Sequence, residues 1–239
     1  MTGSPHDDGD TLRLVALNAG VSDPSSTRML VDRIAQKSLD QLAARSIPAS
    51  LSVIDLAPLA VDVAKAMVAG FPGEKVQAAI DTLARADAII AATPVYKAGM
   101  SGLFKSFIDL IDNDLIIAKP VVLAATAGTA RHAMVADEQM RPLFAFLRAM
   151  PVPTSIFAAP EDWGSPDLGV RIDRAAIELT QLLLSGVGRS ITNAGWQGYQ
   201  HQFDGNAAQA ERTPGEVNFD SDLMRLAAGG SLRSPAGQS

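Results

Sequence analysis

The chain has no cysteine, only three histidines and few aromatic residues among its 239 positions. Without cysteine it can form no disulfide, no thiolate nucleophile, no iron–sulfur cluster and no cysteine-ligated zinc site. The histidines, His6, His132 and His201, are scattered along the sequence, which argues against a histidine-rich metal cage. We therefore expect no bound metal ion.

Charged residues are also few, at 19% of the chain, and no run of basic residues occurs. The 20 Lys and Arg residues are outnumbered by 26 Asp and Glu residues, so the formal net charge is -6. Proteins that bind nucleic acid usually cluster positive charge against the phosphates. Nucleic acid is therefore not an expected partner.

Long apolar runs are missing as well, since none approaches the ~20 residues that cross a bilayer as a helix. The N-terminus, MTGSPHDDGD, is acidic and polar, whereas a secretory signal is basic and then apolar. We expect a cytoplasmic protein with no membrane partner. Residues 1–10 are expected to form a disordered tail.

Hydrophobic residues, by contrast, make up 47% of the chain, enough for a sizeable core. Apolar runs of strand length alternate with longer segments of helical period, a pattern typical of βαβ units around a parallel sheet. The predicted strands cover residues 12–17, 51–55, 88–92, 121–125 and 154–158. The predicted helices cover residues 25–45, 74–85, 101–111, 137–150 and 172–185, with an irregular or short helical insert at 61–72. The fold class is therefore a doubly wound α/β domain.

The alternating pattern stops near Gly186. We expect the folded domain to cover residues 11–188 and a C-terminal extension to cover residues 189–239. The extension contains one short amphipathic segment, which we expect to dock on this subunit or a neighbouring one through Phe219, Leu223, Met224 and Leu226. The helix at 101–111 is apolar on more than one side and is a candidate oligomer surface through Leu103, Phe107, Leu110 and Ile111.

Ligands of open parallel sheets bind beyond the carboxyl ends of the strands, so the loops after the first, third and fourth strands are candidate sites. The first loop, NAGVSDPSSTR at 18–28, places a helix start and several hydroxyls where they can bind an anion such as a phosphate. It matches neither the Walker loop nor the G-x-G-x-x-G fingerprint. The alternative is that one serine only caps the helix. The candidate residues are Gly20, Ser22, Ser25, Ser26 and Thr27.

The second loop, TPVYKAGMSGLFK at 93–105, can offer main-chain amides and a flat aromatic wall to a planar ligand, or it can be an ordinary connection. Its candidate residues are Pro94, Val95, Tyr96, Lys97 and Gly99. The third loop, TAGTARH at 126–132, has small residues that permit close approach of the backbone, and one cation. Its candidate residues are Thr126, Ala127, Gly128, Thr129 and Arg131, although a surface salt bridge is an alternative for the arginine.

Together the three loops resemble those of the NADPH-dependent FMN reductase family, and the resemblance covers about residues 12–185. In that family the first loop cradles the phosphate, the second runs along the isoalloxazine ring, and the third lies at the pyrimidine side of the ring. This sequence supplies SDPSSTR, PVYKAGMSGLFK and TAGTARH at these points. It is most similar to the FMN reductases that partner luciferase-like flavin monooxygenases. It departs from them in Val21-Ser22, where many relatives have Gly-Ser and a nearby Arg, and in its long tail.

The resemblance implies a flavodoxin-like sheet of five parallel strands in the order 2-1-3-4-5, with helices on both faces. It implies FMN and NADPH or NADH as cofactors, with hydride transfer from the nicotinamide to the flavin. The implied reaction needs no side-chain acid or base. Main-chain groups near Gly128 and Thr129, aided by Arg131, would stabilise the negative charge on the reduced flavin. A homodimer or homotetramer and a partner flavin-dependent monooxygenase are further expectations.

Two other functions fit a chain of this kind. One is an electron-carrier flavodoxin that uses no nicotinamide, which the modest acidity and the extra tail disfavour. The other is a reductase of quinones, azo dyes or metal oxyanions, which the sequence does not separate from an FMN reductase. A receiver domain is excluded, because it needs acidic residues after the first strand and an Asp at the end of the third, where this chain has Asn18 and Thr93-Pro94.

Overall fold

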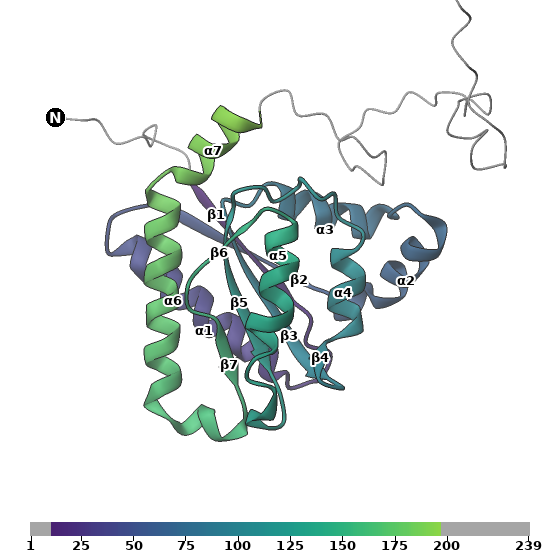
Figure 1. The fold of residues 1–239 in the computed structure, drawn as a ribbon, viewed down its shortest axis with the longest axis horizontal. Helices are drawn as coiled ribbons and strands as arrows, with labels where there is room; N and C mark the ends of the chain where they lie inside the picture. The colour runs from purple at the N-terminus through teal and green to yellow at the C-terminus, as the bar shows by residue number, and fades with distance from the viewer. Residues whose placement is uncertain (1–10, 197–239) are drawn as a thin grey trace, which may run out of the picture. The chain divides into compact units, whose positions relative to one another are not determined.

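The structure is a computed structural model that describes residues 11–196 (Figure 1). The expected N-terminal tail at 1–10 lies outside the described residues. So do the expected docking side chains Phe219, Leu223, Met224 and Leu226.

A parallel sheet forms the centre of the described domain. Its strands are β1 (Leu12–Asn18), β2 (Ala49–Asp55), β3 (Ala88–Tyr96), β5 (Pro120–Thr126), β6 (Met150–Pro151) and β7 (Ile156–Ala158). The order is β2-β1-β3-β5-β6, with β7 also paired to β5, and every one of these pairs is parallel. The predicted order 2-1-3-4-5 is confirmed. The sheet has seven strands instead of five because the fifth is divided and β3 gains a hairpin partner.

The hairpin corrects the prediction of a loop from Thr93 onward. Pro94, Val95 and Tyr96 belong to β3, and β4 (Gly99–Met100) folds back antiparallel to it. The two residues between the strands have positive φ angles, 51° at Lys97 and 65° at Ala98, as a tight hairpin turn requires. Pro94 is tolerated in β3 because the pairing of β1 with β3 ends at Ala92, so on that side no strand needs an amide hydrogen from position 94.

Two short strands, β6 and β7, pair with β5 where the sequence predicts one strand over 154–158. The guanidinium of Arg141 donates hydrogen bonds to the carbonyls of Val152, at 2.9 Å, and Pro153, at 3.2 Å. These bonds occupy the two carbonyls after β6. The Val152 amide hydrogen still reaches the Val121 carbonyl of β5, at 2.9 Å, whereas Pro153 has no amide hydrogen to contribute to the ladder. The prediction of a continuous strand over 154–158 is therefore correct only for its last three residues.

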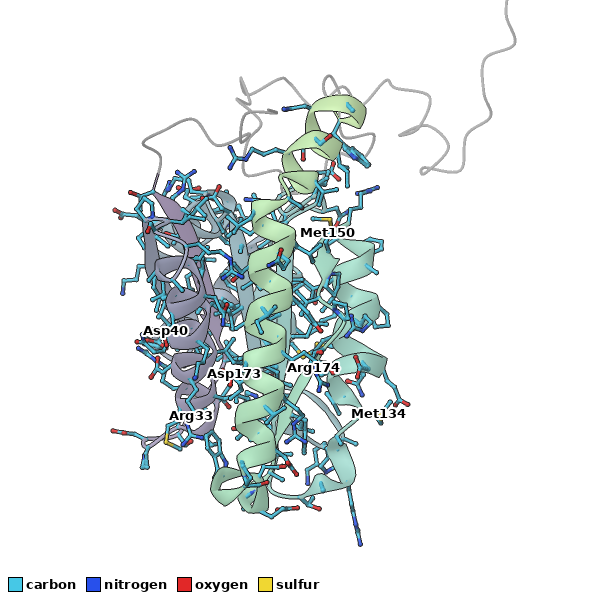
Figure 2. All side chains as sticks on the ribbon, turned by 90° about the vertical axis from the view of Figure 1, so that its left-hand side faces the viewer. Arg33, Asp40, Met134, Met150, Asp173 and Arg174 are labelled. Atoms are coloured by element: carbon cyan, nitrogen blue, oxygen red, sulfur yellow. The ribbon has the colours of Figure 1, made fainter. Side chains whose placement is uncertain are left out.

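Helices cover both faces of the sheet (Figure 1). They are α1 (Ser26–Ala43), α2 (Ala60–Ala69), α3 (Glu74–Ala84), α4 (Gly102–Ile108), α5 (Arg141–Phe146), α6 (Pro166–Leu184) and α7 (Val187–Gly195). Figure 2 shows α6 beside α1, with Asp173 on α6 and Arg33 on α1 labelled. Lys37 of α1 forms an ion pair with Asp173 at 3.2 Å.

Strand residues alternate between two hydrophobic cores. Leu14 and Ala16 pack with α1 and α6, whereas Val15 and Leu17 pack with the helices of the opposite face. This period of two is what a strand buried on both faces requires. The doubly wound architecture predicted from the sequence follows from it.

The predicted oligomer surface on the helix at 101–111 is wrong. Phe107, Leu110 and Ile111 are buried in the core of this same chain, and Leu103 is half-buried against it. The helix itself, α4, ends at Ile108. A helix that is apolar on several sides is here covered by its own domain, so its pattern does not indicate a subunit contact.

Other helix boundaries also differ from the predictions. The helix expected at 137–150 is a π-helical turn, Ala136–Met140, followed by α5, and it ends before Arg148 adopts a φ of 57°. Helix α6 starts before the predicted position 172, because Ser165 caps it and Pro166 takes its first position. The insert at 61–72 is mostly helix α2. The domain boundary at 188, which falls inside α7, stays a prediction.

Candidate functional site

A cavity of about 210 Å³ lies at the carboxyl ends of β1, β3 and β5. Three segments far apart in the sequence line it, and they are the segments that the sequence singled out. The lining residues are Gly20, Val21, Ser22, Ser26, Thr27, Pro94, Val95, Tyr96, Thr126, Ala127 and Gly128. Most of the predicted site residues are thus brought together at one place.

The first wall is the loop after β1 and the start of α1. Ser25 is the N-cap of α1, and its hydroxyl accepts the Arg28 amide hydrogen at 3.1 Å. Ser25 does not line the cavity, and the cap that it forms is the structural role that the sequence left as an alternative. Ser26 and Thr27 border the cavity with the first turn of α1, whose N–H groups have no partner within the helix. Such a turn favours a bound anion.

The second wall is the end of β3 and its hairpin. Tyr96 lines the cavity and is half exposed, whereas Val95 is buried. The hairpin turn is held by Gln139, whose side-chain amide donates to the Ala98 carbonyl at 2.9 Å and accepts the Met100 amide hydrogen at 3.3 Å. Gln139 lies on the π-helical turn Ala136–Met140. The position of the hairpin relative to the cavity is therefore tied to this π-helical turn.

The third wall, after β5, is joined to the first by a buried hydrogen bond. The Thr126 hydroxyl lies 2.7 Å from the hydroxyl of Thr27. Both threonines line the cavity. Ala127 donates its amide hydrogen to the carbonyl of Ala158 at 3.2 Å, which fixes the start of the loop against β7.

A polar network lies behind the first wall. The Asn18 side chain donates to Asp55 Oδ1 at 2.8 Å and accepts the Gly20 amide hydrogen at 3.1 Å. Arg28 forms ion pairs with Asp55 at 2.8 Å and Asp32 at 2.9 Å. The hydrogen bond to Asp32 and the charge of Asp55 raise the pKa of Arg28 against the opposing effect of burial. The arginine is thus committed to carboxylates beside the cavity.

Five predicted residues do not line the cavity. Ser25 is the cap described above, Lys97 sits on the hairpin turn, and Gly99 is in β4. Thr129 caps the short 3-10 helix Ala130–His132 by accepting the Arg131 amide hydrogen at 3.4 Å, and the side chain of Arg131 is exposed. Their part in ligand binding stays a prediction.

Several residues of the site were missed from the sequence. Val21 lines the cavity between two predicted residues, and its neighbours Gly20 and Ser22 were a sufficient signal. Asn18 ends the first strand, so its position was known but its contacts were not. Asp55 and Gln139 lie far from the loops in sequence, and no local pattern indicates them.

The cavity lining suits an anionic, partly planar ligand. It offers hydroxyls and backbone amides from two loops, an apolar wall of Val21, Pro94, Val95 and Tyr96, and no carboxylate or other charged side chain. Within residues 11–196, no group of three or more His, Asp or Glu side chains is placed to hold a metal ion. In the same part of the chain, no helix is long and apolar enough to span a membrane.

Comparison with known proteins agrees with this geometry. The sequence model of the NADPH-dependent FMN reductase family matches residues 12–164. The chain belongs to this family. An FMN reductase (NADPH) of Pseudomonas aeruginosa is 35% identical over 151 residues, 63% of this chain and 78% of the relative. The NADH-dependent FMN reductase SfnF of Pseudomonas fluorescens is 34% identical over 168 residues, 70% of this chain and 87% of the relative.

A solved structure supports the same assignment. An oxidoreductase from Corynebacterium diphtheriae superposes with a TM-score of 0.71 at 40% identity, and the match covers 73% of this chain and 98% of that one. The chain is therefore an enzyme of the NAD(P)H:FMN oxidoreductase type with a flavodoxin-like fold. FMN and a nicotinamide nucleotide are its cofactors, as expected from the sequence.

Proposed function

We propose that the cavity binds FMN, with the phosphate at the first turn of α1 and the isoalloxazine ring between the β3–β4 hairpin and the loop after β5. The observation that carries the proposal is the meeting of three loops at a cavity with hydroxyl and amide donors and no carboxylate. A carboxylate there would repel the phosphate, whereas helix N-terminal amides attract it.

Ser22, Ser26 and Thr27 would hold the phosphate, and Tyr96 and Val95 would flank the ring. When bound, the nicotinamide supplies a hydride from C4 and the flavin accepts it at N5. The protein orients the two rings, and the main-chain amides near Gly128 and Thr129 favour negative charge on the pyrimidine side of the flavin. No side chain of the lining needs to exchange a proton.

The choice between NADPH and NADH is not decided by the relatives, whose names include both. Anaerobic stopped-flow absorbance with FMN and then each nucleotide tests donor and reaction together. Saturable bleaching of the oxidised flavin band is the expected result. Binding of FMN without bleaching by either nucleotide would favour an electron carrier, and absence of FMN binding would refute the cavity assignment.

We also propose that the reduced FMN leaves the protein and is consumed by a flavin-dependent monooxygenase. The cavity supports the release, because Val21, Ser22, Ser26 and Gly128 in its lining are exposed, so the ligand has a route to solvent. Capture of reduced FMN by an added apoflavodoxin, monitored under anaerobic conditions, tests the release. Reduced flavin that stays with the reductase would contradict the proposal and favour direct reduction of another acceptor.

We propose further that the protein is a homodimer or homotetramer and that it is located in the cytoplasm. Supply of reduced flavin requires access to the NAD(P)H pool, which supports the location. Light scattering coupled to size-exclusion chromatography measures the oligomer, and a monomeric mass would contradict that part. Cell fractionation followed by immunoblotting tests the location.

A further inference from the structure

The loop that forms the first wall of the cavity is held by a hydrogen-bonded network of side chains that do not themselves line the cavity. Asn18, 3% exposed at the end of β1, links the Gly20 amide to the carboxylate of Asp55 at the end of β2. The other oxygen of Asp55 accepts a hydrogen bond from Arg28 on α1 at 2.8 Å. One network therefore connects the start of the loop, the edge strand and the helix.

The loop is closely fitted to the side chains that hold it. A Cβ on Gly20 would lie 2.1 Å from the Ser25 hydroxyl and 3.1 Å from Asn18 Oδ1. Asn18 therefore holds the loop at its start, and Ser25 holds it at its end by capping α1. Between them, the residues that line the cavity have a set backbone path.

The network also offsets part of its own negative charge, because the carboxylates of Asp55 and Asp32 share the guanidinium of Arg28. Asp55 brings a carboxylate behind an anion-binding loop, where alone it would oppose binding of a phosphate. Arg28 pairs with this carboxylate, and Asp32 pairs with Arg28 in turn. The arginine thus acts through Asp55 and does not present a free cation to the cavity.

We propose that Asn18 and Asp55 are positioning residues that shape the loop 19–25 for the phosphate of the flavin, and so set a preference for FMN over riboflavin. This rests on the proposed function. Neither residue lines the cavity. Their effect is to keep the Gly20 amide and the loop in one arrangement, which lowers the cost of ordering the loop on binding.

Titration of flavin fluorescence with FMN and with riboflavin tests the inference. The readout is the ratio of the two dissociation constants, because a loss of general stability changes both together. Asn18→Ala should reduce the preference for FMN roughly five- to tenfold, the worth of about one hydrogen bond, and leave riboflavin binding unchanged. Ser38→Ala is the matched control, since it removes a buried hydrogen bond of 2.9 Å to Ile34 within α1 and should keep the ratio.

A swap of the two side chains gives a second test in case the alanine variant unfolds. Asn18→Asp places two carboxylates against each other and should reduce the preference for FMN. Adding Asp55→Asn restores a hydrogen-bond donor between positions 18 and 55 and keeps an acceptor for Arg28. The ratio of the two dissociation constants should therefore be closer to the wild-type ratio in the double variant than in Asn18→Asp. Failure of the second substitution to recover the ratio would overturn the inference.

The outcomes also separate this inference from the proposed function. A wild-type protein that binds neither flavin refutes the FMN site, and the positioning role with it. A wild-type protein that binds both flavins equally keeps the site and overturns the positioning role. Equal losses of FMN and riboflavin affinity in Asn18→Ala would overturn it as well.

Discussion

The hydroxyls of Thr27 and Thr126 lie 2.7 Å apart and are buried, so the first turn of α1 is bonded directly to the end of β5. The two residues are 99 positions apart in the sequence. Each borders the cavity from a different wall, so this bond sets the spacing of the two walls.

The bond between these threonines should be visible in a double-mutant cycle. Thr126→Val leaves the Thr27 hydroxyl buried without its partner and should lower the free energy of unfolding by about 1–3 kcal/mol. Adding Thr27→Val removes the remaining unpaired hydroxyl, so the double variant should lose less than the sum of the single losses. Urea unfolding measures all four proteins, and strictly additive losses would contradict a direct bond.

Gly20→Ala should disturb both the cavity and the helix behind it. The added Cβ would lie 2.1 Å from the Ser25 hydroxyl, so that hydroxyl must turn away and α1 loses its N-cap. We expect a loss of about 1 kcal/mol of stability and weaker FMN binding. Gly128→Ala is the control for stability, because a Cβ there meets nothing within 4 Å. Thermal melts that shift equally for both variants would refute the explanation.

Gln139→Ala should loosen the hairpin wall. The variant removes both hydrogen bonds to a turn in which Lys97 and Ala98 already have unfavourable positive φ angles. We expect stability to fall by about 1–2 kcal/mol. The affinities for FMN and riboflavin should fall together, because the proposed site places Tyr96 beside the ring and not beside the phosphate. Gln36→Ala, which removes a surface hydrogen bond to Asp40, should change neither the stability nor the flavin affinities. An effect on FMN alone would disprove this assignment.

Lys119 should make stability depend on pH above neutrality. Its ammonium group donates to the Leu83 and Ala84 carbonyls at the end of α3. Burial lowers the pKa of Lys119 to about 8 from 10.5, against the opposing charge of Asp87, while Arg13 lowers it further. Between these two values the unfolded chain binds more protons than the folded one, so the contribution of this group to stability rises with pH across that window.

The Lys119→Met variant checks this dependence. Urea unfolding at several pH values from 7.5 to about 10.5 measures the free energy of unfolding. With increasing pH this free energy should rise less, or fall more steeply, in the variant than in the wild type. Lys65→Met, at an exposed position on α2, should keep the wild-type dependence. Equal slopes for the Lys119 variant and the wild type would show that this lysine is not the cause.

Local patterns in the sequence were sufficient for the alternation of strands and helices. The strands are buried on both faces, so each appears as a short apolar run such as Leu12–Asn18, and helices such as α1 carry apolar residues on one side. The candidate loops follow directly, because a ligand site of this fold lies where strands end. The family resemblance rests on the same loops, and its match to residues 12–164 confirms it.

Contacts between distant residues could not be read in the same way. The hairpin at Lys97 and Ala98 is hydrogen-bonded to Gln139, and the carbonyls between β6 and β7 are hydrogen-bonded to Arg141. The apolar helix at 101–111 pointed to a subunit contact, yet its own domain covers it. These outcomes depend on which side chains the fold brings within hydrogen-bonding or packing distance.

The sequence by itself determined the order of the elements and the three loops that meet at the cavity, because hydrophobic periodicity and turn residues act over short stretches of chain. The strand order of the sheet was implied by the family resemblance that these loops carry. Only the tertiary structure decided that Ser25 serves as a cap, that Arg28 is paired with carboxylates, and that Asn18 and Asp55 stand behind the loop. Those assignments depend on distances between segments far apart in sequence, which the packing of helices on the sheet establishes.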